Sequence, residues 1–236
     1  MLEPGALAAS GLPDPAPFDA VLAARARDGG FDYRGATGQD RKRLAAYLAN
    51  LGDARFAEMT AAEKKAFLIN AYNAWAIQTM LDHPGKKITA VDGAFQKTLH
   101  RIGGRAMTLD QVEDALRSAA DPRVHFAIVC ASRSCPALAP KAYVAEALDE
   151  TLDRQARAFV NDASKNRIDR KDGTVALSMI FRWNRKEFER EGQRLDVYVS
   201  RFVTDLETAR WLAEAAPDPS FLDYDWSPNQ PEPGKP

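Results

Sequence analysis

The sequence predicts a single α+β domain, rich in helix, with a small central sheet flanked by helices. Three observations predict it. Apolar residues recur at helical spacing over most of the chain, a short β-rich run lies at 124–131, and a turn at Lys171-Asp172-Gly173 folds 167–178 into a hairpin. Because 236 residues are enough to bury one large core, one domain is the preferred interpretation.

The two ends of the chain differ in composition from the rest. Residues 1–16 and 227–236 are rich in proline, glycine and small residues and offer no periodic apolar face. We therefore expect a disordered N-terminal tail at 1–16, the domain at 17–226 and a proline-rich C-terminal tail at 227–236. The first residues lack the pattern of a secretory signal. The expected location is periplasmic or secreted if Met1 replaces a removed signal peptide, and cytoplasmic otherwise.

The charge of the chain is balanced, with 32 Lys and Arg residues against 33 Asp and Glu residues. This balance is typical of an ordinary globular protein and argues against a nucleic-acid partner. The longest apolar runs, such as 126–131, are far shorter than the roughly 20 residues that span a bilayer. We therefore expect neither nucleic-acid binding nor membrane insertion, and the oligomeric state stays open.

Helices are expected in the first half of the chain at several places. Apolar residues repeat at helical spacing over 18–26 and 44–51. The strongest helix signal starts at Thr60, which can form a capping box with Glu63, and it continues to a stop before Pro84.

A second capping box, Thr108 with Gln111, opens a shorter helix. The run 124–131 is rich in β-forming residues and is bounded by turn signals, so it is expected to be the central strand. A long helix is expected over 143–159. Further short helices are expected at 184–190, 195–203 and 207–215, and 221–226 can return to the sheet.

Cys135 carries the most chemically promising pattern. It precedes Pro136, and proline is favoured at the first position of a helix, so Cys135 is expected to cap a short helical turn. The helix dipole at such a place lowers a thiol pKa and favours the nucleophilic thiolate. His125, ten residues upstream on the expected strand, could serve as the general base.

Other interpretations use the same side chains. Cys130 can be a core residue or can pair with Cys135, with His125 as a hydrogen-bonded core imidazole. His100 and His125 could join the two cysteines as zinc ligands, but the spacing is at the edge of the usual range. A dithiol redox site lacks the compact Cys-x-x-Cys pattern. We expect no metal and no cofactor.

Asn70 and Asn73 are unusual because they lie inside an otherwise apolar helical segment. A buried amide without partners costs about 1–3 kcal/mol, so both side chains must find backbone, water or a ligand. They are either a structural clamp or contacts to a substrate near the thiol. Glu113 could orient His125, or could simply suit the helix dipole in its place near the start of a helix.

These residues fall within a set of motifs that resembles one family, called domain of unknown function 547. The resemblance covers roughly 31–229. The motifs are AFLINAYNA at 66–74, LDQVE at 109–113, RVHFA at 123–127, CASRSCP at 130–136, AY at 142–143, LSMIFRW at 177–183 and DYDWS at 223–227.

The resemblance implies bacterial relatives that are often exported, and a papain-like or transglutaminase-like thiol fold. It would make Cys135 the nucleophile, His125 the base, and Asn70 or Glu113 the orienting residue. Two departures count against a simple transfer. This chain has Asp114 after Glu113 where the family often has histidine, and papain-like enzymes usually carry the thiol on the long central helix.

The expected function is that of a thiol-dependent enzyme, a hydrolase or transferase acting on an amide, a thioester or a glutathione-like peptide. The alternative is a non-catalytic ligand-binding or scaffold domain with a structural Cys130–Cys135 loop. Either would take a small-molecule or peptide partner. The expected catalytic residues are Cys135, His125 and Glu113, and the expected binding residues are Asn70, Asn73, Cys130, Ser132, Arg133 and Ser134.

Overall fold

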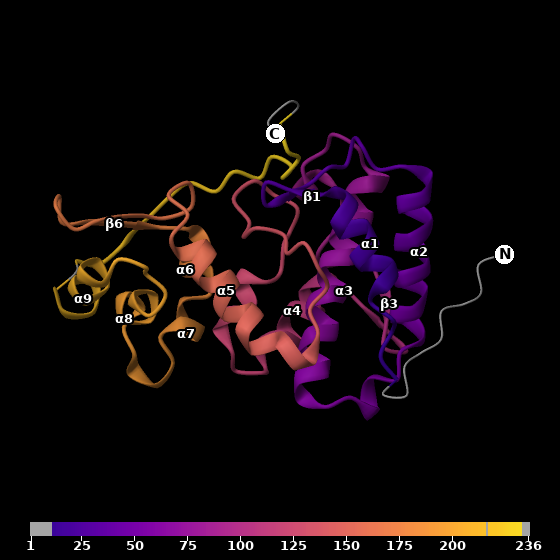
Figure 1. Cartoon of the computed structure of the whole chain (residues 1–236), viewed down its shortest axis with the longest axis horizontal. Coiled ribbons are helices and arrows are strands. Elements are labelled where there is room, and N and C mark those ends of the chain that lie inside the picture. The colour runs from indigo at the N-terminus through magenta and orange to yellow at the C-terminus, as the bar shows by residue number, and fades with distance from the viewer. Residues whose placement is uncertain (1–10, 216, 233–236) are drawn as a thin grey trace.

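Helices dominate the structure, a computed structural model that describes residues 11–215 and 217–232 (Figure 1). In chain order they are α1 (Ala16–Arg25), α2 (Gly38–Asp53), α3 (Ala61–Asp82), α4 (Leu109–Arg117), α5 (Leu148–Val160), α6 (Met179–Trp183), α7 (Arg185–Phe188), α8 (Leu195–Ser200) and α9 (Leu206–Ala215). Short 3₁₀ helices lie at Phe56–Glu58, Ile88–Ala90, Pro122–Phe126, Ala145–Ala147 and Arg190–Gly192. None of the described helices is both long and apolar enough to cross a bilayer.

The two helices of the predicted capping boxes, the long α3 and the shorter α4, begin where expected. The Thr60 side chain accepts a hydrogen bond from the backbone N–H of Glu63, and the Glu63 carboxylate accepts one from the N–H of Thr60. Thr108 and Gln111 make the same reciprocal pair at the start of α4. Both predictions are confirmed because a capping box satisfies orphan backbone donors within one turn of chain.

The strands form three small sheets, so the α+β class is confirmed while the single central sheet is not. β1 (Ala26–Arg27) pairs with β2 (Gly30–Phe31), and β3 (His100–Ile102) pairs with β4 (Arg105–Met107), both antiparallel. The predicted hairpin is present as antiparallel β5 (Arg167–Asp169) and β6 (Thr174–Leu177). β7 (Ser220–Phe221) adds to it in parallel with β6, so the return of the chain to the sheet starts slightly earlier than predicted.

The prediction of a central strand at 124–131 is wrong. Pro122–Phe126 is a 3₁₀ helix that begins after Asp121, whose side chain accepts from Arg123 N–H. The chain from 127 to 130 is irregular. Its backbone groups bind a side chain of α3 and not a neighbouring strand. The Asn73 amide donates to Ala127 O and accepts from Val129 N–H. The apolar run at 124–131 reflects burial, and buried strands and other buried segments have the same apolar pattern.

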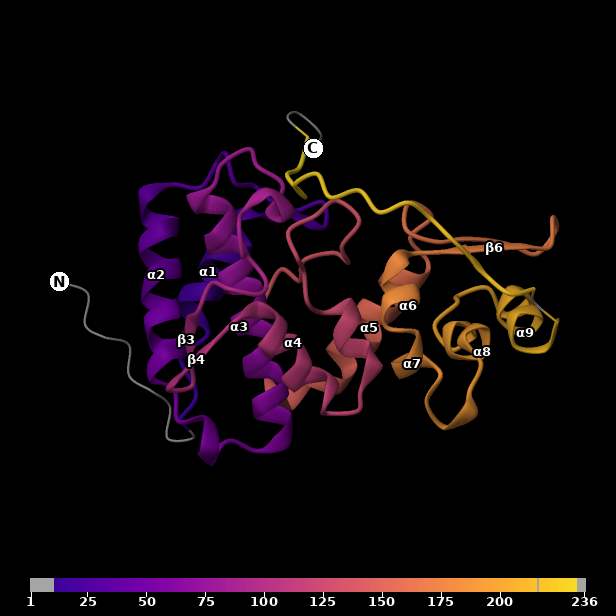
Figure 2. The same cartoon turned by 180° about the vertical axis from the view of Figure 1, so that it is seen from behind.

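Two large apolar clusters fill most of the interior and share one helix, and a small third cluster lies around Met80 and Ile88. The first lies among α1, α2, α3 and α4 and includes Leu148 and Leu152 of α5. The second includes Phe159 of the same helix and Phe126, and it continues through α6 to α9. The two views of the ribbon show α1 to α4 on one side and α6 to α9 on the other, with α5 between them (Figures 1 and 2). Because α5 contributes to both clusters, the halves make one domain.

The last described segment crosses back from the second half to the first (Figure 1). Asn229 N–H donates to Ala131 O, and Asn229 O accepts from Phe31 N–H of β2. A Cβ atom at Gly30 would overlap the Asn229 carbonyl, so this close approach requires glycine. Residues 227–232, assigned to a tail from composition, therefore belong to the packed chain.

At the N-terminal end, too, the packed chain extends beyond the predicted domain limit of residue 17. Residues 11–16 also fell in a predicted tail, but Gly11 O accepts from Arg55 N–H and α1 begins at Ala16. The rest of the two predicted tails, 1–10 and 233–236, lies outside the described residues.

Candidate functional site

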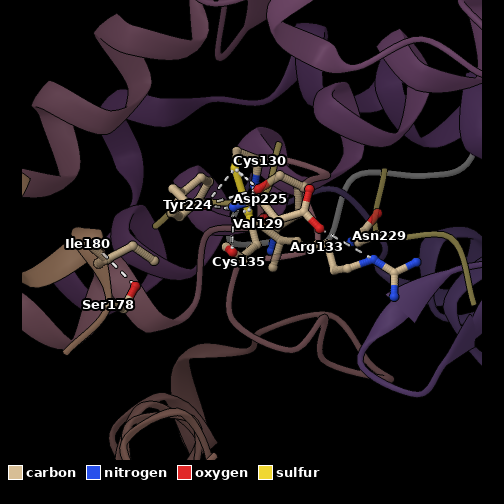
Figure 3. The surroundings of a disulfide bond; sticks show 12 residues. Val129, Cys130, Arg133, Cys135, Ser178, Ile180, Tyr224, Asp225 and Asn229 are labelled. Carbon is tan, nitrogen blue, oxygen red and sulfur yellow. Dashed lines mark hydrogen bonds and ion pairs between the residues drawn. A yellow bond between two sulfur atoms is a disulfide. The ribbon is translucent and has the colours of Figure 1, made fainter. Parts of the chain in front are cut away.

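The cysteine loop is the centre of a compact polar cluster (Figure 3). Cys130 and Cys135 are joined as a disulfide. Cys130 N–H donates to Cys135 Sγ at 3.0 Å, and the Tyr224 hydroxyl lies 3.3 Å from each sulfur. Ser132 Oγ lies 3.2 Å from each sulfur and donates to the Tyr224 oxygen at 3.0 Å. Two hydroxyls and one amide are thus gathered around the sulfur atoms.

The predicted helical turn after Cys135 is absent, since 136–139 is irregular chain in the structure. Because no helix begins at Cys135, a helix dipole does not act on this sulfur. The loop instead relies on discrete donors and on an unusual backbone. Ala131 has a φ angle of 62°, in the left-handed region that non-glycine residues rarely adopt. Such strain persists only where surrounding contacts hold it, which here include the bond from Asn229 N–H to Ala131 O.

A pocket of about 240 Å³ opens beside the sulfur atoms, between the two halves of the molecule. Three of its walls come from segments far apart in sequence, namely α4, the cysteine loop and the last described segment. Its lining residues with polar or aromatic side chains are Tyr72, Phe95, Gln96, Asp110, Glu113, His125, Cys130, Cys135, Trp183, Asn184, Tyr224 and Trp226. The structure therefore brings the three predicted catalytic residues, Cys135, His125 and Glu113, to one pocket.

His125 is 2% exposed and is held between two carboxylates. Its Nε2 atom lies 2.9 Å from Glu187 Oε2, and its Nδ1 atom lies 3.9 Å from Glu113 Oε1. Arg117 bridges the same two acids, at 2.8 Å from Glu113 and 3.1 Å from Glu187. The closest polar partner of the imidazole is thus Glu187, and Glu113 is the more distant acid.

The two acids beside His125 have opposite pKa shifts. Burial raises the pKa of Glu113, although the charges of Arg117 and His125 act against it. Burial also acts to raise the pKa of Glu187, but the hydrogen bond to His125 and the charges of His125 and Arg117 outweigh it and hold the pKa low. Glu187 is therefore the ionised partner, and Glu113 is the acid that more readily holds a proton.

The hydroxyl of Tyr224 keeps its proton over the whole physiological range. Burial raises the pKa of Tyr224 to about 12, against the hydrogen bond from Ser132. A protonated phenol can donate to a sulfur atom. Sequence reasoning did not predict this contact of Tyr224, nor the contacts of Glu187 and Arg117.

Asn70 and Asn73 do not line the pocket. Asn70 binds both backbone groups of Tyr143, at 2.8 Å for each contact. Asn73 binds Ala127 O at 2.9 Å and Val129 N–H at 2.8 Å. The structure therefore places both amides on backbone groups, as a structural clamp would, and away from the pocket lining.

The remaining predicted binding residues have different places. Arg133 is exposed, with Asp225 and Glu232 each at 3.8 Å, and its backbone N–H donates to Ser227 O. Ser134 Oγ accepts from Asp225 N–H. Both hold the last segment against the loop outside the pocket, whereas Cys130 lines the pocket and Ser132 contacts both sulfurs.

The proposed zinc ligands are not gathered in one place. His100 stacks on Trp75 of α3, with ring centroids 4.3 Å apart, and does not line the pocket of Cys135. Within 11–215 and 217–232, no three His, Cys, Asp or Glu side chains are arranged to hold a metal ion.

Comparison with known proteins gives a family and no established activity. No curated protein and no solved structure matches the chain significantly. The family model described as "Protein of unknown function, DUF547" matches residues 56–160. The match includes α3, α4, the cysteine loop and α5, and it stops before Trp183, Glu187 and Tyr224. Residues 56–160, a little under half of the chain, are therefore similar to the DUF547 family.

Proposed function

We propose that this protein is a thiol-dependent acyl-transfer enzyme, a hydrolase or transferase on an amide, thioester or glutathione-like peptide, with Cys135 as nucleophile in the reduced state. One observation carries the proposal. Cys135 Sγ lies against a pocket and is surrounded by hydrogen-bond donors, with Glu113 and His125 lining the same pocket.

The donors suit a thiolate better than they suit a disulfide. A negatively charged sulfur is a much stronger acceptor than a neutral one, and hydrogen bonds to charged groups are worth about 1.5–3 kcal/mol. Cys130 N–H and the Tyr224 O–H can both donate to Cys135 Sγ, while Ser132 donates to Tyr224. Each such bond lowers the pH at which the thiolate forms.

The reaction begins after the Cys130–Cys135 bond is reduced. Two equivalents of a small thiol supply the electrons and leave as their own disulfide. The Cys135 thiolate then attacks the carbonyl carbon of the substrate, and the carbonyl electron pair moves to oxygen. Collapse of this intermediate expels the amine or thiol and leaves the acyl group on Cys135 as a thioester. Water, or an acceptor amine or thiol, releases it and restores the thiol.

In place of His125, the base expected from the sequence, Glu113 is the proton carrier in this proposal, because both ring nitrogens of His125 face carboxylates. The raised pKa of Glu113 and its place in the pocket suit an acid that gives a proton to the leaving group and later takes one from water. His125 then acts as a positioning residue. His125 contacts Glu187 and lies close to Glu113, and in this way it keeps the Glu113 carboxylate oriented toward the pocket.

The alternative function, a binding or scaffold domain, is favoured by the disulfide itself. Cys130 and Cys135 are bonded, and a disulfide sulfur is not a thiolate, which is the nucleophilic form of cysteine. In that case the loop is a staple, and the pocket takes a ligand without reacting with it.

Alkylation kinetics separate the two functions. The variant Cys130→Ser leaves Cys135 as the only thiol, and the matched control Cys135→Ser leaves only Cys130. The iodoacetamide rate of each is measured against pH by mass spectrometry. We expect half-maximal labelling of Cys135 at least one unit below the ordinary thiol value of about 8.5, and of Cys130 nearer to it.

Acyl transfer itself is tested with aryl thioesters on Cys130→Ser. An acyl adduct on Cys135 that forms and then decays supports the enzyme. Labelling of Cys135 at the ordinary pH, together with no acyl adduct, supports the scaffold.

A further inference from the structure

The outer part of the pocket has a wall of three aromatic rings, and the acyl-transfer step uses only the hydroxyl of one of them, Tyr224, and none of the ring faces. Trp183 comes from α6, and Tyr224 and Trp226 come from the last described segment. The ring centroids of Trp183 lie 4.7 Å from Tyr224 and 5.8 Å from Trp226, and those of Tyr224 and Trp226 lie 4.6 Å apart. Trp183 is 48% exposed, which is unusual for a ring of its size. An aromatic surface thus lies open at the pocket.

Apart from His125, whose ring nitrogens face Glu187 and Glu113, the titratable acids and bases that line the same pocket with a charge at neutral pH are carboxylates. Asp110 and Glu113 come from successive turns of α4, and no Lys or Arg side chain is among the lining residues in the described chain. Glu113 is partly neutralised, because Arg117 lies 2.8 Å from it. Asp110 has no such partner, since no Lys, Arg or His nitrogen of the described residues lies within 4.0 Å of its carboxylate. Burial, followed by the charge of Asp114, raises the pKa of Asp110, while a hydrogen bond with Gln96 and the charge of Arg117 act in the opposite direction.

Aromatic faces beside an unmatched carboxylate favour one class of ligand. A cation over a Trp or Tyr face gains about 0.5–2 kcal/mol from the ring quadrupole, and an acid within the same pocket adds a Coulomb attraction. An anionic ligand would meet repulsion from Asp110. The pocket volume of about 240 Å³ is below that of typical drug-sized sites, so it suits a group the size of one side chain.

We propose that the aromatic wall and Asp110 form a subsite for a positively charged amine, so that the substrate carries an ammonium group close to the acyl carbon. This inference rests on the proposed thiol function, because only that function makes the bound amine part of a substrate. The binding of the cation itself does not depend on that function.

Charge-matched thiol reagents test the subsite. Cys130→Ser is treated with 2-(trimethylammonium)ethyl methanethiosulfonate or with the 2-sulfonatoethyl reagent, each of which forms a mixed disulfide on Cys135 and releases methanesulfinate. The rate of the cationic reagent is divided by the rate of the anionic reagent. This ratio is then divided by the ratio measured with the free thiol 2-mercaptoethanol, which corrects for the intrinsic reactivity of the two reagents. We expect a normalised preference for the cationic reagent of about tenfold, since a nearby unit charge in a partly buried site is worth that much. In the Asp110→Asn background the preference falls by about fivefold.

Asp114→Asn is the matched control, because Asp114 lies on the same helix but does not line the pocket. We expect it to change the preference by less than twofold. Equal rates for the two reagents, or equal losses in the Asp110 and Asp114 variants, overturn the subsite. Binding of tetramethylammonium to the disulfide form, followed through tryptophan emission, supplies a readout without thiol chemistry. A strong cation preference at a Cys135 that is not activated supports the subsite and contradicts only the proposed enzyme.

Discussion

His125 and Glu187 are 62 positions apart in sequence, yet His125 Nε2 and Glu187 Oε2 lie 2.9 Å apart. The contact joins the 3₁₀ helix Pro122–Phe126 of the cysteine region to α7 in the second half of the molecule. It also fixes one side of the pocket, since His125 lines it. The pair therefore links the stability of the domain to the shape of the candidate site.

Glu187→Gln is expected to lower the free energy of unfolding by about 1–3 kcal/mol, because it removes the carboxylate nearest the buried His125 and one of the acids that bind Arg117. Glu189→Gln is the control, since Glu189 makes an i,i+4 pair with Arg185 that is worth only about 0.3–0.5 kcal/mol. Urea unfolding at neutral pH measures both. Equal losses in the two variants would show that the contact with His125 adds nothing.

The same variant has a defined pH dependence. The folded pKa of Glu187 is lowered, so its contribution is fully present above the unfolded value of about 4.3 and is lost as pH falls through the folded pKa. The destabilisation by Glu187→Gln should therefore be largest at neutral pH and shrink below about pH 4. Glu113 has the opposite sign, because a raised carboxyl pKa loses stability as pH rises through and above 4.3. Urea titrations from pH 3.5 to 7 that give Glu187→Gln a constant loss would contradict the assignment.

Much of the fold follows from signals that act within one or two turns of chain. The capping boxes at Thr60 and Thr108 and the turn between β5 and β6 each satisfy local backbone groups, so sequence reasoning found them. The strand predicted at 124–131 failed because its backbone partners lie on another helix. Asn73, more than 50 positions away, binds the groups that a neighbouring strand would take.

The candidate site was predictable only in its local part. Cys135, His125 and Glu113 lie within one stretch of the chain, 113–135, and their chemistry could be inferred from residue type. Tyr224 is 89 positions from Cys135, and Glu187 is in a short charged helix whose pattern is typical of a solvated surface. Nothing local to these residues indicates a contact with a thiol or an imidazole, so only the tertiary structure could find them.

The clamp by Asn73 gives a prediction that separates stability from site geometry. Asn73→Ala and Asn70→Ala each leave two buried backbone groups unpaired, and each is expected to lower the free energy of unfolding by about 2–4 kcal/mol. Only Asn73 holds 127–129, which leads into the cysteine loop. In the Cys130→Ser background, Asn73→Ala should lower the alkylation rate of Cys135 or broaden the dependence of that rate on pH. Asn70→Ala should leave both unchanged. Equal profiles would mean that the loop does not need this clamp.

The hydroxyl of Tyr224 gives the most direct prediction for the thiolate. Tyr224→Phe keeps the ring against Trp183 and Trp226 and removes the donor to Cys135 Sγ. The Ser132 hydroxyl, 3.2 Å from the same sulfur, is then free to donate in its place. In the Cys130→Ser background, Tyr224→Phe should therefore raise the half-maximal pH of alkylation by about half a unit, and Tyr224→Phe with Ser132→Ala by about one unit or more.

Tyr33→Phe is the matched control for that series. Its hydroxyl donates to Asn229 Oδ1 at 2.9 Å, so the variant removes a phenol bonded to the same last segment without touching either sulfur. The iodoacetamide profile of Cys135 should not move in Tyr33→Phe if the effect of Tyr224 is a direct hydrogen bond. An equal shift in both tyrosine variants would mean that the segment positions the loop as a whole. Because the double variant removes both nearby hydroxyls while the Cys130 N–H remains, any residual depression of the half-maximal pH measures the contribution of that backbone donor.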